Sequence, residues 1–93
     1  MNSLEIRIDM IERLYNLVDK GKIQQFKDYS KYVVNVNEEI GGMVEYNIYR
    51  RAIDKITSAA VSLDYKKLDE AKESIDLYKK FTKYLNNGII FYK

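Results

Sequence analysis

Glycine residues divide this chain into pieces of helical length, and within each piece apolar residues recur at every third or fourth position. The chain contains no proline, so the glycines at positions 21, 41, 42 and 88 are its main structural breaks. Apolar residues with this spacing indicate one buried helix face. We therefore predict an all-α fold, a small antiparallel bundle of four helices, or of three long ones if a helix continues through Gly41 and Gly42.

The first piece begins with Asn2 and Glu5, whose spacing matches a capping box at the start of a helix. Its apolar residues form two adjoining stripes, and its acidic residues occupy the third side, where we expect solvent and an ion pair between Asp9 and Arg13. Gly21 is expected to end this helix. The stripes are Leu4, Ile8, Ile11, Tyr15 and Val18, and Ile6, Met10, Leu14 and Leu17.

The second piece, residues 23–40, has helical spacing, but its middle is also compatible with a strand. Val33, Val34 and Val36 are β-branched, which strands prefer, so a strand is the alternative for residues 31–37. We expect a helix because the flanking residues have a helical pattern and no hairpin partner lies nearby. The apolar stripe consists of Phe26, Tyr29, Val33, Val36 and Ile40.

The third and fourth pieces have the most regular pattern. Asp64 is a good N-cap for the fourth piece, and Gly88 follows two asparagines at its end. We expect residues 1–88 to form a single helical-bundle domain and residues 89–93 to form an apolar and basic C-terminal tail. The apolar stripes are Tyr46, Tyr49, Ile53, Ile56, Ala60 and Leu63, and Leu68, Ala71, Ile75, Tyr78 and Leu85.

Residues 49–81 resemble one helical hairpin of the tetratricopeptide family. The resemblance rests on the run AAVSLDYKKLDEAKESIDLY and covers about a third of the chain. Repeats of that family stack in several copies, and this chain holds no second copy. The resemblance therefore implies a helical hairpin at this place in the fold.

The composition argues against most enzyme classes. The chain has no cysteine and no histidine, which removes nucleophile–histidine pairs, thiolate metal sites and disulfides. No glycine-rich phosphate-binding motif is present. The carboxylates at positions 5, 9 and 12, and those at 69 and 73, lie on the polar sides of their helices, where a solvated surface is favoured over a cation site. We therefore expect no catalysis, no cofactor and no metal ion.

The sequence also predicts where the protein acts. Its first residues mix acids with apolar residues, unlike a signal peptide. No apolar run approaches the ~20 residues that a membrane-spanning helix needs. We expect a cytoplasmic protein without a transmembrane segment.

Charge and aromatic rings are distributed unevenly along the chain. Residues 1–46 carry 6 basic and 8 acidic residues, whereas residues 47–93 carry 10 and 6. Residues 77–93 contain four lysines and five aromatic rings but no acid. The chain has nine tyrosines, and tyrosine is enriched at protein interfaces. The candidate partner-binding residues are Arg50, Arg51, Lys79, Lys80, Lys83, Tyr84, Phe91, Tyr92 and Lys93.

These features predict a non-enzymatic interaction protein that acts through its helix faces and its aromatic, basic C-terminal segment. The expected partner is another protein or a second copy of the chain. We expect the protein to form a homodimer. The alternative is a DNA- or RNA-binding accessory protein whose cations contact phosphates while its rings stack on bases. The small net charge of +2 and the absence of a nucleic-acid-binding motif argue against that alternative.

In architecture, a small cationic helical bundle with a C-terminal segment also resembles the bacteriocin immunity proteins, which protect a producer cell from its own toxin. The resemblance is one of fold and is carried by no motif. It implies a membrane receptor complex as the partner.

Overall fold

The structure, a computed structural model, describes residues 3–35, 42–62 and 64–87, and within these ranges it contains only α-helices and turns. This confirms the predicted all-α bundle of four helices. Residues 31–35 are helical, as expected over the strand alternative, while residues 36–41 and 88–93 lie outside the described residues. The helices are α1 (Ser3–Asp19), α2 (Ile23–Asn35), α3 (Gly42–Ser62) and α4 (Tyr65–Asn87).

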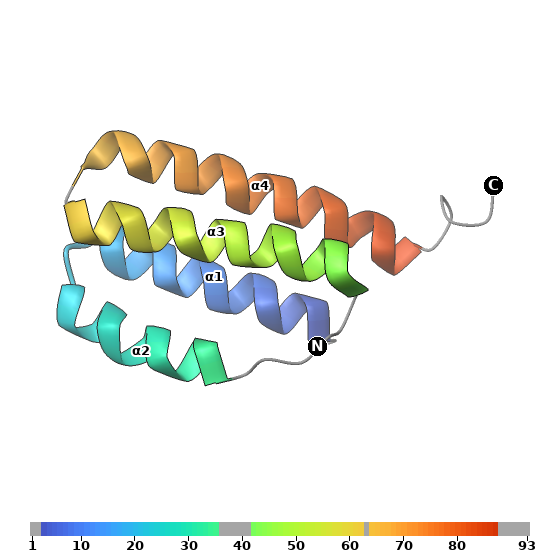
Figure 1. Cartoon of the computed structure of the whole chain (residues 1–93), viewed down its shortest axis with the longest axis horizontal. Coiled ribbons are helices and arrows are strands. Elements are labelled where there is room, and N and C mark those ends of the chain that lie inside the picture. Colours follow the sequence, from blue (N-terminus) through green and yellow to red (C-terminus); the bar gives the residue numbers. More distant parts are fainter. Residues whose placement is uncertain (1–2, 36–41, 63, 88–93) are drawn as a thin grey trace.

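Successive helices run in opposite directions (Figure 1). The most extensive contact joins α3 to α4, and α1 packs against all three other helices. By contrast, α2 packs mainly on α1. The bundle is therefore a three-helix core of α1, α3 and α4, with α2 attached to one side of it.

The core forms where apolar stripes of these helices meet. Ile11, Leu14 and Ile56 are completely buried. Ala52 and Ala71 are buried as well, and small side chains let α3 and α4 approach closely. Attachment of α2 depends on two side chains that join the same core, Phe26 and Val33.

The buried face of α1 differs from the prediction. Ile6 is 43% exposed, and Ile8 and Tyr15 are only partly buried. The buried residues lie between the two predicted stripes and keep a three–four spacing that includes an arginine. They are Leu4, Arg7, Met10, Ile11, Leu14 and Val18. The prediction was wrong for Ile6, and it left Arg7 out of the buried face because it counted only apolar residues.

Two predicted helix ends are confirmed. At the end of α1, the Gly21 amide donates to the Val18 carbonyl at 3.0 Å and the Lys22 amide donates to the Leu17 carbonyl at 2.8 Å. This pair of bonds is a Schellman motif, and Gly21 supplies the positive φ of 73° that the motif requires. At the start of α4, the Asp64 side chain accepts a hydrogen bond from the Lys66 amide at 2.9 Å, as an N-cap does.

Candidate functional site

A charged network is buried at the centre of the three-helix core. Arg7 of α1 is 1% exposed and Glu45 of α3 is fully buried. The Arg7 Nη1 atom donates to Glu45 Oε1 at 2.5 Å, and the hydroxyl of the buried Tyr78 of α4 donates to Glu45 Oε2, also at 2.5 Å. One carboxylate therefore joins three helices, with a cation on one oxygen and a phenol on the other.

Two tyrosines of α3 enclose the guanidinium group. The Arg7 Cζ atom lies 4.6 Å from the centre of the Tyr49 ring and 5.8 Å from that of the Tyr46 ring, within the range of cation–π attraction. The Tyr49 ring in turn packs on the Tyr78 ring, with centroids 5.6 Å apart. The rings replace water around the cation, which lowers the cost of burying it.

The same burial holds the phenols in their neutral form. The pKa of Tyr49 rises to about 12 because burial disfavours the phenolate. Burial also raises the pKa of Tyr78, and the hydrogen bond to Glu45 and the charge of that carboxylate raise it further. Tyr78 therefore acts as a hydrogen-bond donor throughout the physiological pH range, and the network holds the helices together.

The sequence contained a signal for this network that the pattern reading missed. Arg7 follows Leu4 by three residues and precedes Ile11 by four, so it fits the buried spacing of α1. Glu45 precedes Tyr49 by four residues and Ala52 by seven, so it continues the buried face of α3. A cation and an anion that each interrupt an apolar face indicate a buried pair.

The predicted partner-binding residues do not gather at one place. Arg50 pairs with Asp54 of its own helix, with 3.7 Å between Nη2 and Oδ1. The Lys79 Nζ atom lies 2.9 Å from Glu12 Oε2 and so ties α4 to α1. Arg51, Lys80 and Lys83 are exposed and take part in no ion pair with the described residues. Phe91, Tyr92 and Lys93 lie outside the described residues.

Some of these candidates do share a surface with exposed apolar side chains. We name as the α3–α4 face the outer surface along the contact between these helices. Arg51 and Leu77 line one pocket of about 280 Å³ between the helices, and positions seven residues away on each helix lie on the same side. The α3–α4 face comprises Val44, Ile48, Arg51, Leu77, Lys80 and Tyr84.

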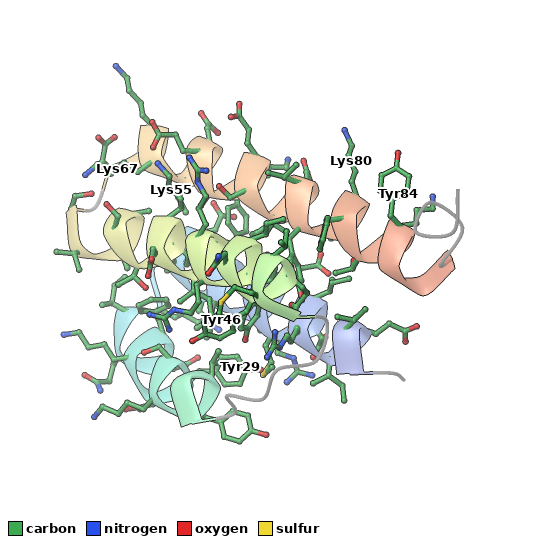
Figure 2. All side chains as sticks on the ribbon, turned by 45° about the vertical axis from the view of Figure 1, so that its right-hand side comes forward. Tyr29, Tyr46, Lys55, Lys67, Lys80 and Tyr84 are labelled. Atoms are coloured by element: carbon green, nitrogen blue, oxygen red, sulfur yellow. The ribbon has the colours of Figure 1, made fainter. Side chains whose placement is uncertain are left out.

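Several apolar side chains of the α3–α4 face are exposed to solvent. Val44 is 59% exposed, Leu77 is 52% exposed and Tyr84 is 53% exposed. Figure 2 shows Lys80 and Tyr84 projecting from α4 on the side away from α1 and α2. Lys83 lies four residues after Lys79 and so faces toward α1. The basic C-terminal run is thus divided between two sides of α4.

Three further observations concern the acidic groups, one predicted ion pair and the hydropathy of the helices. No group of three carboxylates in the described part of the chain could hold a metal ion. The predicted ion pair between Asp9 and Arg13 is confirmed, with 2.9 Å between Oδ2 and Nε. Over the described ranges, no helix is both long enough and apolar enough to cross a bilayer.

Comparison with protein-family models, with curated proteins and with solved structures finds no match for this chain. The functional argument therefore depends on the site geometry.

We expect Arg7→Met to lower the free energy of unfolding by about 3–5 kcal/mol, because the Glu45 carboxylate then stays buried without its cation. The triple variant Arg7→Met/Glu45→Met/Tyr78→Phe removes all the polar members and should regain most of that loss. Urea unfolding followed by circular dichroism measures both. The matched control is Arg13→Met, which breaks an exposed pair and should cost less than about 1 kcal/mol. An Arg7→Met variant as stable as the control would contradict the network.

The raised pKa of Tyr78 predicts a loss of stability in alkali. In the unfolded chain this phenol loses its proton near the ordinary value of 10.0, whereas the folded protein retains it. Stability is therefore full below that pH and falls as the pH rises above it, by about 1.4 kcal/mol per pH unit for each retained proton.

The test compares wild type with Tyr78→Phe by urea unfolding from about pH 9 to about pH 11. Tyr49 is present in both proteins, so the effect of its raised pKa is common to the two curves. Wild-type stability should fall more steeply than that of the variant. Parallel curves would show that Tyr78 is not protected from deprotonation.

Proposed function

We propose that this chain is a non-enzymatic interaction protein of the cytoplasm that forms a homodimer through its α3–α4 face. The observation that carries the proposal is the run of half-exposed apolar side chains, Val44, Leu77 and Tyr84, across two adjoining helices. Apolar side chains grouped in this way are typical of interaction sites, whereas single exposed ones are common on any protein. Tyr84 is of the type that anchors interfaces.

The charges around the α3–α4 face favour a second copy as the partner. Arg51 and Glu73 line the same pocket, and Lys80 lies two turns after Glu73 on α4. None of these three takes part in an ion pair with the described residues. In a two-fold dimer the same surface of both copies meets. A surface that carries both cations and anions can therefore pair its cations with the anions of the second copy.

Within this proposal, Phe91, Tyr92 and Lys93 extend the interface beyond the end of α4. This contribution stays a prediction from the sequence. Removal of residues 89–93 measures it directly, since the dimer should then weaken while the helical content stays the same.

Nucleic-acid binding is less well supported than self-association. The cations that would contact phosphates are Arg50, Arg51, Lys79, Lys80 and Lys83. Two of them, Arg50 and Lys79, already pair with carboxylates of the chain. Of the remaining three, Arg51 and Lys80 lie on the α3–α4 face whereas Lys83 faces toward α1, so no more than two of these cations share a surface that a phosphate backbone could follow. The alternative keeps a clear signature, salt-sensitive binding of DNA or RNA that Lys79→Ala/Lys80→Ala/Lys83→Ala abolishes.

Sedimentation equilibrium tests the dimer. We expect wild type to approach twice the monomer mass of 11.0 kDa as concentration rises. Leu77→Asp should stay monomeric, because it would bury a charge in an apolar contact. The matched control is Val61→Asp, at a valine of α3 that is 80% exposed and lies outside the face. A wild type that remains monomeric at its highest soluble concentration would contradict the proposal.

A charge exchange then tests whether the partner is a second copy. Arg51→Glu should weaken the dimer by roughly fivefold, because it sets acid against acid across the interface. Arg51→Glu/Glu73→Arg restores opposite charges in the same chain and should restore the dimer. Failure of the double variant to recover would place Arg51 and Glu73 outside the interface.

A further inference from the structure

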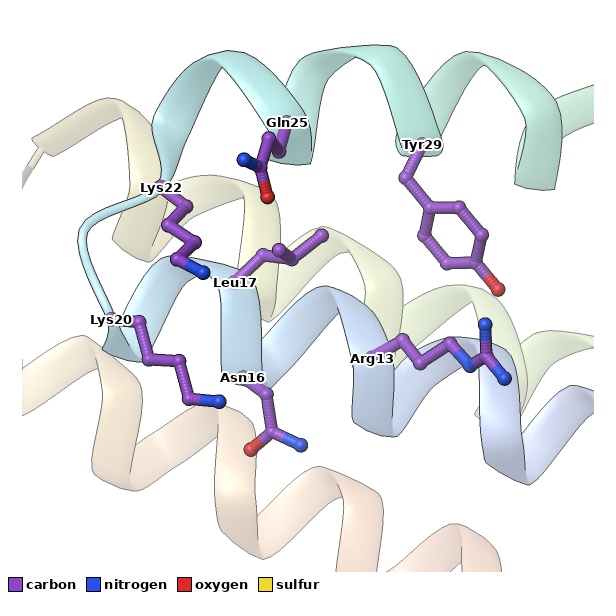
Figure 3. A pocket seen from close by; sticks show the side chains of 7 residues that line it. All are labelled: Arg13, Asn16, Leu17, Lys20, Lys22, Gln25 and Tyr29. Carbon is purple, nitrogen blue, oxygen red and sulfur yellow. The ribbon is translucent and has the colours of Figure 1, made fainter.

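A pocket of about 480 Å³ lies between α1 and α2, on a different side of the bundle from the α3–α4 face. Its lining comes from the last two turns of α1, from the turn at Gly21 and from the first two turns of α2. Figure 3 shows the side chains of Asn16, Lys20 and Lys22 beside the turn, and Tyr29 farther along α2, near Arg13. The volume is in the range of pockets that bind small molecules.

The lining of this α1–α2 pocket carries positive charge without a carboxylate. Three of its residues are cations, Arg13, Lys20 and Lys22. Lys20 and Lys22 take part in no ion pair with the described residues. Arg13 uses its Nε atom for Asp9, which leaves the other edge of its guanidinium group available. The pocket therefore has the electrostatic character of an anion site.

Two acids close to the pocket in sequence, Asp19 and Asp28, do not line it. Asp28 accepts a hydrogen bond from Gln24 at 3.2 Å. Asp19 lies near enough to Tyr15 to help raise its pKa, and Tyr15 lines a separate pocket between α1 and α4. The first turn of α2 contains no acid, so the positive end of its dipole adds to the charge of the lysines at this end of the pocket.

The rest of the pocket lining consists of apolar surface and side-chain amides. Leu17 is partly buried and packs against the core, and Tyr29 does the same from α2. Together they provide an apolar surface that a flat ring can contact. Asn16 and Gln25 each offer an amide that both donates and accepts hydrogen bonds. The pocket thus combines a cationic end at the turn with an apolar and amide-bearing wall.

We propose that the α1–α2 pocket binds a small phosphorylated molecule with a flat hydrogen-bonding ring, which is the chemistry of a nucleotide. Lys20 and Lys22 hold the phosphates at the turn, and the ring lies along Leu17 and Tyr29. The amides of Asn16 and Gln25 bond to its edge. This site is independent of the proposed dimer, because it shares no residue with the α3–α4 face.

The test is titration of the protein with ATP. Binding is monitored by the changes in the amide chemical shifts in NMR and by calorimetry. We expect saturable binding, with the largest shifts at residues 13–29. Lys20→Ala/Lys22→Ala should weaken binding by about tenfold or more, since hydrogen bonds to charged groups are lost. Both lysines are exposed, so the melting temperature should stay the same.

Two controls separate this site from general attraction of anions. Lys66→Ala/Lys72→Ala removes the same charge from two exposed positions of α4 and should leave ATP affinity unchanged. Inorganic tripolyphosphate carries the phosphates without the ring and should bind several-fold more weakly than ATP. The proposal would be overturned by chemical-shift changes that do not saturate with ATP, or by an equal loss of ATP affinity in both double variants. Tripolyphosphate that binds as tightly as ATP would also overturn it.

Discussion

The ion pair between Arg7 and Glu45 constrains the packing of this small bundle more than any apolar contact does. Apolar side chains pack in several registers at similar cost, but a buried cation is stable only where an anion meets it. Here the anion is on another helix, and its second oxygen is bonded to Tyr78 on a third. A shift of α1 or α3 along its axis by one turn would leave a buried charge without its partner, and a shift of α4 would break the hydrogen bond from Tyr78 to the second carboxylate oxygen.

Helix α2 lies outside this constraint. It contributes no residue to the network and is held by Phe26 and Val33 at the edge of the core. Because it contacts mainly α1, the space beside the α1–α2 turn remains open and forms the pocket lined by Lys20 and Lys22. The three-helix core also carries the α3–α4 face, so the two proposed surfaces are formed by different pairs of helices.

Local patterns predicted the elements of this fold, whereas its polar centre depends on contacts between distant residues. Gly21 and Asp64 act on neighbours within a few positions, so their roles could be inferred from spacing alone. Arg7 meets a partner 38 residues away, and a pattern that sorts residues into apolar and polar places it in solvent. The basic run near the C-terminus shows the same difficulty. Its lysines are adjacent in sequence, but Lys79 pairs with Glu12, 67 residues away.

The central claim is that Arg7 is buried as a bonded cation beneath a tyrosine ring, and NMR of its side chain tests this most directly. The structure predicts separate guanidinium proton resonances that exchange slowly with water. They should be shifted upfield by the Tyr49 ring, whose centre lies 4.6 Å from Cζ, and Tyr49→Leu should remove that shift. A single averaged resonance in rapid exchange with water, at the position of an exposed arginine, would contradict the account.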